Sequence, residues 1–187
     1  WRRGGSPGRR DLLSASPIEP VVINEFLAHT DLPQVDFIEL FNRSTAAVNL
    51  SGWILTDDST TNRFRIPNGT SLAPGATLAF PESDLGFRLS SGGETIYLLS
   101  PDASRVADAV RFGGQENGVS TGRVPDGSEQ FRRLAVPTPD ALNGQRRAED
   151  IVINEIFYNP PAGDDDEFIE IHHRGSTAVS LAGWRIR

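Results

Sequence analysis

Val22-Ile23-Asn24-Glu25-Phe26 returns 130 residues later as Val152-Ile153-Asn154-Glu155-Ile156. Two further blocks recur at an offset of 131: Phe37-Ile38-Glu39-Leu40 returns as Phe168-Ile169-Glu170-Ile171, and Leu50-Ser51-Gly52-Trp53 returns as Leu181-Ala182-Gly183-Trp184. A period this long indicates whole domains in tandem, because solenoid units run only about 20 to 50 residues. The sequence therefore predicts one complete domain and the beginning of a second.

The expected domain boundaries follow from this repeat and from local composition. Residues 1–20 are rich in Arg, Gly, Ser and Pro, and such a segment buries too little apolar surface to offset the entropy of ordering, so we expect a flexible linker. The complete domain spans residues 21–143, a charged linker spans 144–150, and residues 151–187 form the truncated start of the second copy. We expect the chain to be an excerpt from a longer polypeptide.

Composition excludes several classes of function. The 187 residues include no Cys, so disulfides, thiolate chemistry and sulfur-ligated zinc are excluded. The net charge of -7 disfavours a nucleic-acid partner, because such binding depends on basic side chains that neutralise phosphates. No apolar run is long enough for a transmembrane helix, which needs about 18 or more residues.

The fold class follows from short runs of β-branched and aromatic residues between turn formers, a pattern typical of an all-β sandwich. In the second strand, Ile38 and Leu40 face one side, and Glu39 faces the other among aromatic residues. No segment shows a helical period. We expect strands at residues 21–27, 37–41, 53–55, 63–66, 76–80, 94–99, 106–112, 120–124 and 131–136.

These residues resemble the lamin-tail domain, an immunoglobulin-like β-sandwich found at the end of nuclear lamins and in many bacterial secreted proteins. The resemblance extends over nearly all of residues 20–143, and residues 151–187 are similar to the first third of another copy. The order and spacing of the motifs carry it: Ile23-Asn24-Glu25, Phe37-Ile38-Glu39-Leu40 with Asn42, Leu50-Ser51-Gly52-Trp53, Leu72-Ala73-Pro74-Gly75, Ser120 through Arg123, Pro125-Asp126-Gly127, and Pro137-Thr138-Pro139 to Asn143.

The resemblance implies a non-catalytic interaction or spacer module of an exported multidomain bacterial protein, like the copies attached to secreted hydrolases or spore-coat-like kinases. The family has no catalytic residues to carry over, so we expect no enzyme activity and no cofactor. The expected location is extracellular or at the cell surface, and the expected partners are a protein, a cell-surface component or neighbouring domains. Two alternatives stay open: a glycan- or calcium-dependent adhesion module, and the tail of a filament protein, although no heptad-rich rod is present in this sequence.

Three sets of residues are candidates for structural roles. Trp53 and Trp184 are expected in the core, with carbohydrate stacking as the alternative. Glu25 and Glu39 could be an acid–base pair of the kind that glycoside hydrolysis needs. We favour a structural role in which they accept backbone or Arg hydrogen bonds. Asn42, at the turn after the second strand, is also assigned a structural role.

Acidic runs are the candidates for metal binding. Carboxylate oxygens are the ligands that Ca²⁺ prefers, so Asp164, Asp165, Asp166 and Glu167 form a possible calcium site, with Asp57-Asp58 as a second candidate. The run lacks the spacing and central Gly of an EF-hand loop. His172 and His173 are neighbours in an expected strand and point to opposite faces, which is poor geometry for binding one metal ion.

Overall fold

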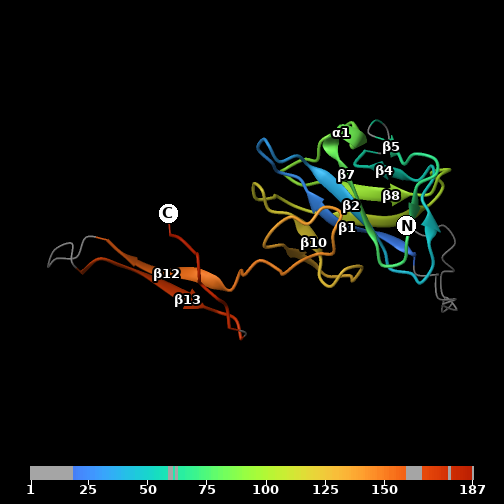
Figure 1. Cartoon of the computed structure of the whole chain (residues 1–187). Coiled ribbons are helices and arrows are strands. Elements are labelled where there is room, and N and C mark those ends of the chain that lie inside the picture. The colour runs from blue at the N-terminus through green and yellow to red at the C-terminus, as the bar shows by residue number, and fades with distance from the viewer. Residues whose placement is uncertain (1–18, 59–60, 62, 159–165, 177, 187) are drawn as a thin grey trace, which may run out of the picture.

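Two antiparallel sheets form the folded copy in the computed structural model, which describes residues 19–58, 61, 63–158, 166–176 and 178–186. The first sheet has the order β11-β10-β1-β2-β7 and the second has the order β5-β4-β8-β9 (Figure 1). The first contains β11 (Phe131–Arg133), β10 (Thr121–Arg123), β1 (Val21–Leu27), β2 (Phe37–Asn42) and β7 (Thr77–Pro81). The second contains β5 (Phe64–Arg65), β4 (Ile54–Thr56), β8 (Thr95–Leu99) and β9 (Val106–Arg111).

Alternation along these strands produces one apolar core between the two sheets. Ile23, Phe26, Ile38 and Leu40 come from β1 and β2 and are fully buried, and they pack in one cluster with apolar side chains of β4 and β8 such as Leu55, Ile96 and Leu98. Side chains therefore alternate between the two faces of each strand, as the sequence predicts, and each sheet buries one face in the shared core. The expected immunoglobulin-like β-sandwich is confirmed.

Most strand positions agree closely with the sequence pattern, but a helical turn and a short strand pair at residues 48–49 and 71–72 were not expected. Residues 82–85 form a single helical turn, α1 (Glu82–Leu85), whereas we expected no helix. The turn buries Leu85 and ends at Gly86 in the left-handed region with φ 74°. One turn is too short to produce a helical period, so the pattern could not reveal it. The short strands β3 (Val48–Asn49) and β6 (Ser71–Leu72) pair with each other in a separate two-stranded antiparallel sheet.

The expected linker at 144–150 is partly structured. The Ala135 N–H donates to the Gln145 carbonyl at 3.0 Å, and the Arg147 N–H donates to the Arg133 carbonyl at 2.7 Å. Arg147 also pairs with Glu116 at 2.8 Å. Residues 145–147 thus extend the edge of the five-stranded sheet beyond β11, because the unpaired edge offers backbone partners that composition alone does not reveal.

A largely buried ion pair, with side chains 7% and 16% exposed, ties the two sheets together. The Arg123 guanidinium contacts Asp108 on β9 at 2.9 Å and donates from Nε to the Ile23 carbonyl on β1 at 2.7 Å. Asp108 in turn accepts the Ile23 N–H at 2.8 Å, and the guanidinium carbon lies 4.5 Å from the centroid of the Phe131 ring. The ion pair therefore joins β9 of one sheet to β1 and β10 of the other, and both charged side chains also form hydrogen bonds with the backbone of β1.

The second copy is represented by the hairpin of β12 (Ile151–Phe157) and β13 (Phe168–His173), which extends away from the sandwich (Figure 1). Ile153 and Ile156 correspond to the buried Ile23 and Phe26 but are 53% and 58% exposed. The difference arises because no second sheet covers the hairpin among the residues that the structure describes. Its pairing register nevertheless repeats that of β1 and β2.

Candidate functional site

An irregularity in β1 brings two polar side chains onto the outer face of the sheet. Ile23 lies opposite Leu40 and Glu25 lies opposite Glu39, so Asn24 is an extra residue that forms a β-bulge. The bulge lets Ile23 and Phe26 both face the core while Asn24 and Glu25 point outward. The same bulge occurs at Asn154 in the hairpin, where the Asn154 amide donates to Glu170.

Glu25 holds the segment that follows β11. Its carboxylate accepts the Thr138 N–H at 3.0 Å and the Thr138 hydroxyl at 2.7 Å, and the residue has no exposed surface. Burial raises the pKa of Glu25, because desolvation penalises the charged form more than the hydrogen bonds from Thr138 stabilise it. We call residues 137–143 the closing segment, since they cover the outer face of β1 and β2.

Glu39, which lies opposite Glu25, holds the closing segment two residues further along, at Asp140. The Asp140 N–H donates to Oε2 at 2.8 Å and the Asn24 amide donates to Oε1 at 3.2 Å, and Glu39 is also fully buried. Burial raises the pKa of Glu39 to about 8; the hydrogen bond from Asn24 opposes the shift, and the charge of Glu25 adds to it. Two facing buried carboxyl groups cannot both be charged at low cost, and both pKa values are raised, so the pair retains a proton near neutral pH.

A second hydrogen-bonded group fixes the end of the closing segment. The Asn24 amide also donates to Asp126 at 2.8 Å, and Asp126 accepts the Asn143 N–H at 2.9 Å. The Gly127 N–H donates to Asn24 at 3.0 Å, in a turn where Gly127 has φ 68° and where a Cβ atom would lie 2.9 Å from the Phe41 ring. Only glycine therefore lets this loop approach the sheet closely.

The chemistry of the acid pair follows from this enclosure. A retaining or inverting glycosidase keeps both carboxyl groups open to the sugar and to water. Here the oxygens of Glu25 and Glu39 accept hydrogen bonds from the backbone of the closing segment, and both residues are fully buried. In this structure the pair fastens one part of the chain to another and is not open to a substrate.

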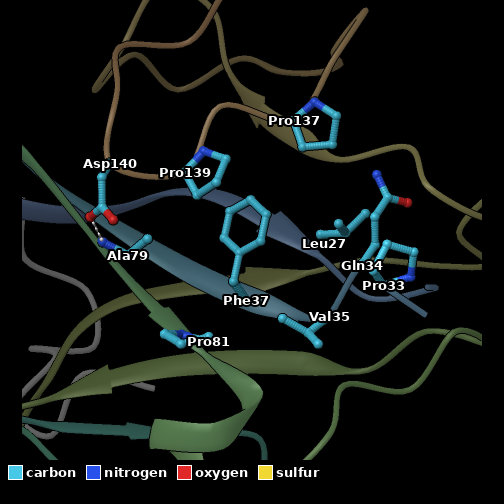
Figure 2. Close-up of a pocket in the computed structure, with 10 residues that line it drawn as sticks. All are labelled: Leu27, Pro33, Gln34, Val35, Phe37, Ala79, Pro81, Pro137, Pro139 and Asp140. Atoms are coloured by element: carbon cyan, nitrogen blue, oxygen red, sulfur yellow. Dashed lines mark hydrogen bonds between the residues drawn. The ribbon is translucent and has the colours of Figure 1, made fainter. Parts of the chain in front are cut away.

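An apolar cleft of about 420 Å³ lies at the start of the closing segment, between that segment and residues 33–35 (Figure 2). Leu27 and Phe37 are buried and form its floor, and the Phe37 ring points toward the closing segment. Residues 33–35 form one wall, and Pro137 and Pro139 form the other. Sequence patterns could not reveal this cleft, because its walls come from segments about a hundred residues apart.

The rim of the cleft includes the outer edge of β7. The Ala79 N–H points away from β2 and donates to the Asp140 carboxylate at 2.8 Å, as the dashed line in Figure 2 shows. Asp140 has φ 60°, in the left-handed region that Asp adopts more readily than most residues. Pro81, at the end of the same strand, has no N–H. This stretch of the sheet edge is therefore closed to strand addition.

The tryptophans differ from the expectation of a buried core. Trp53 is only partly buried and packs against the edge of the core cluster. It directly precedes β4 and does not lie within that strand. Trp184, its counterpart in the second copy, is 50% exposed because its part of the sandwich is not covered by the described residues.

Asn42 lies at the end of β2 and joins that strand to its surroundings. Its amide donates to the carbonyls of Ala46 and Leu72, at 2.8 Å each, and its oxygen accepts the Ser44 N–H at 3.0 Å. The side chain thus replaces backbone partners where the strand ends and the chain turns.

The candidate metal ligands fall partly beyond the described residues. Asp164 and Asp165 lie outside them, while Asp166 and Glu167 are exposed at the start of β13. Within the described ranges, no group of three or more His, Cys, Asp or Glu residues is arranged to hold a metal ion. Asp57 and Asp58 lie with Glu94 around a separate polar hollow near β8. The described part of the chain also contains no helix long and apolar enough to cross a membrane.

Together, the two packed antiparallel sheets and the repeated bulge define an immunoglobulin-like module. The chain belongs to the Lamin Tail Domain family, whose model matches residues 14–114 and 145–187. The first match ends before β10, so the Ser120–Arg123 motif and the closing segment lie outside it, although the resemblance noted from the sequence extended to Asn143. No curated protein matches the chain.

Proposed function

We infer that the folded copy is a non-catalytic interaction and spacer module within a larger, exported multidomain protein. The carrying observation is the use of its two facing carboxylates: Glu25 and Glu39 accept hydrogen bonds from the closing segment and are fully buried. Membership of the Lamin Tail Domain family supports the same role, because that family consists of immunoglobulin-like modules. The partners are a protein, a cell-surface component or a neighbouring domain of the same polypeptide.

Tandem copies suit a spacer. Copies joined by a connection as short as residues 144–150 place successive modules along one chain. The connection is shortened further because residues 145–147 pair with the sheet edge of the first copy. Such an arrangement presents the same surface more than once, which raises avidity for a repeated partner without any new contact.

The proposal is tested on the intact protein. Deleting residues 21–150 should leave any turnover by other domains unchanged and should reduce retention of the protein at the cell surface or on its partner. Retention is measured by fractionation, and turnover is measured in parallel. Turnover of a substrate by the folded copy alone, abolished by Glu25→Gln, would overturn the non-catalytic role.

A further inference from the structure

We propose that the cleft beside the closing segment binds a proline-rich, extended polypeptide segment that carries an Arg or Lys next to its apolar residues. This inference rests on the proposed interaction role and names the class of partner. The cleft measures about 420 Å³, within the range of sites that bind small ligands or a few side chains.

The shape of the cleft is preorganised. Its walls include Pro33, Pro81, Pro137 and Pro139, whose rings fix the backbone φ angle, and its floor is the buried Phe37 ring. Rigid walls lose little conformational entropy on binding, so more of the contact energy appears as affinity. Grooves lined by aromatic and apolar side chains are the usual receptors of polyproline II segments.

The hydrogen-bonding pattern around the cleft favours a polyproline II ligand over an added strand. The N–H groups of Thr138 and Asp140 are bonded to Glu25 and Glu39, and that of Ala79 is bonded to Asp140. An added β-strand would need such donors free. A polyproline II segment keeps its backbone solvated and contacts its receptor through side chains, so it does not need them.

Charge selects the flanking residue of the ligand. Asp140 is exposed at the rim, and within the described ranges no Arg forms an ion pair with it. Only one of its oxygens accepts the Ala79 N–H. The chain carries a net charge of -7, which further favours a basic ligand.

The experiment uses the full chain and the synthetic peptide acetyl-Ala-Pro-Pro-Leu-Pro-Pro-Arg-Ala-amide. A second peptide contains citrulline, the neutral analogue of Arg, in place of Arg. Amide chemical shifts in the NMR spectrum are followed during titration. Saturable shifts at Gln34, Val35 and Ala79 are expected, with the Arg peptide binding about twofold to fivefold more tightly than the citrulline peptide, as for an exposed ion pair.

Three variants separate the apolar contribution to binding from the charged one. Val35→Ser removes an apolar contact at the cleft and should weaken binding of both peptides about fivefold. Val106→Ser, at a similarly exposed valine on β9, should leave binding unchanged. Asp140→Asn keeps the acceptor for the Ala79 N–H and tolerates the same φ angle, so it should only remove the preference for Arg over citrulline.

Three outcomes overturn the inference: no saturable binding of the Arg peptide, shifts that map away from the cleft, or equal losses in Val35→Ser and Val106→Ser. If these occur while deletion of residues 21–150 still reduces retention of the intact protein, only the assignment of the cleft fails. If the deletion is also without effect, the proposed interaction role fails with it.

Discussion

Replacing Glu39 by glutamine should change how the stability of the domain depends on pH. Glu39 is buried opposite Glu25, and its pKa is raised to about 8 mainly by desolvation. In the unfolded chain the same carboxyl group titrates near its ordinary value of about 4.3. The folded state therefore binds a proton that the unfolded state has released throughout the interval between these two values.

The sign of the effect follows from linkage. Because the folded pKa is raised, the stabilisation from the retained proton is present below the unfolded pKa and is lost as the pH rises through about 8. The free energy of unfolding should fall across that window by on the order of 1 kcal/mol per pH unit, and by a few kcal/mol in total. Glu25, Asp36 and Glu94 have pKa values raised by burial as well, so they contribute in the same direction.

Glutamine cannot titrate, and it offers one acceptor where the carboxyl group offers two. The site presents two donors, the Asp140 N–H and the Asn24 amide, so Glu39→Gln should cost one hydrogen bond, about 1 kcal/mol, at pH 5. At pH 8 the variant avoids the cost of a buried charge. Its stability curve should therefore start below that of the wild type and cross it as the pH rises.

Urea unfolding, followed by tryptophan fluorescence between pH 5 and pH 8, measures both curves. Glu129→Gln is the matched control, since Glu129 is exposed, and its curve should run parallel to that of the wild type. If the Glu39→Gln curve also ran parallel to that of the wild type, the buried acid pair would not retain a proton in this pH range, and the explanation given above would be refuted.

Three further predictions concern the sandwich itself. Trp53→Ala should lower the free energy of unfolding by about 2 kcal/mol, less than truncation of a fully buried aromatic residue, because Trp53 is only partly buried. Denaturant midpoints measure this change, and a loss above about 4 kcal/mol would contradict the partial burial of Trp53. Asp108→Ala should lower the free energy of unfolding by about 3 kcal/mol, because it leaves the Arg123 charge buried without its partner. Asp108→Asn keeps an acceptor for the Ile23 N–H and should lower it less, and equal losses of stability in the two variants would argue against the ion pair. Truncation after Asp150 should leave the melting temperature of the sandwich unchanged. Truncation after Asn143 should lower it by several degrees, because the pairing of residues 145–147 with the sheet edge is lost. Identical melting curves for the two truncated chains would show that residues 145–147 do not stabilise the sandwich.

The strands were predictable because their signal is local. The expected strand at residues 21–27 coincides with β1, and the alternation that placed Ile38 and Leu40 on one face and Glu39 on the other agrees with the structure. Each of these inferences needs only the two-residue period of a strand and a turn at its end. The tandem repeat strengthened them, because the same alternation occurs twice in the sequence.

The site was not predictable in the same way, because its contacts join distant parts of the chain. Glu39 and Asp140 are separated by 101 positions, and Glu25 and Thr138 by 113. The bulge at Asn24 has no signature in a single sequence, although it decides which side chains reach the outer face. Repetition of Asn24 and Glu25 as Asn154 and Glu155 was the one available hint that these polar residues in an apolar strand share a role.

The capped edge of β7 matters most when modules are joined in tandem. A short connection keeps neighbouring copies at an effective concentration in the millimolar range, at which exposed strands exchange partners readily. The Ala79 N–H already donates to Asp140, and Pro81 has no N–H. A strand of a neighbouring copy therefore finds no free backbone donor at these two positions with which to extend the sheet. One carboxylate and one proline thus help copies that share the same sequence motifs to fold side by side as separate units.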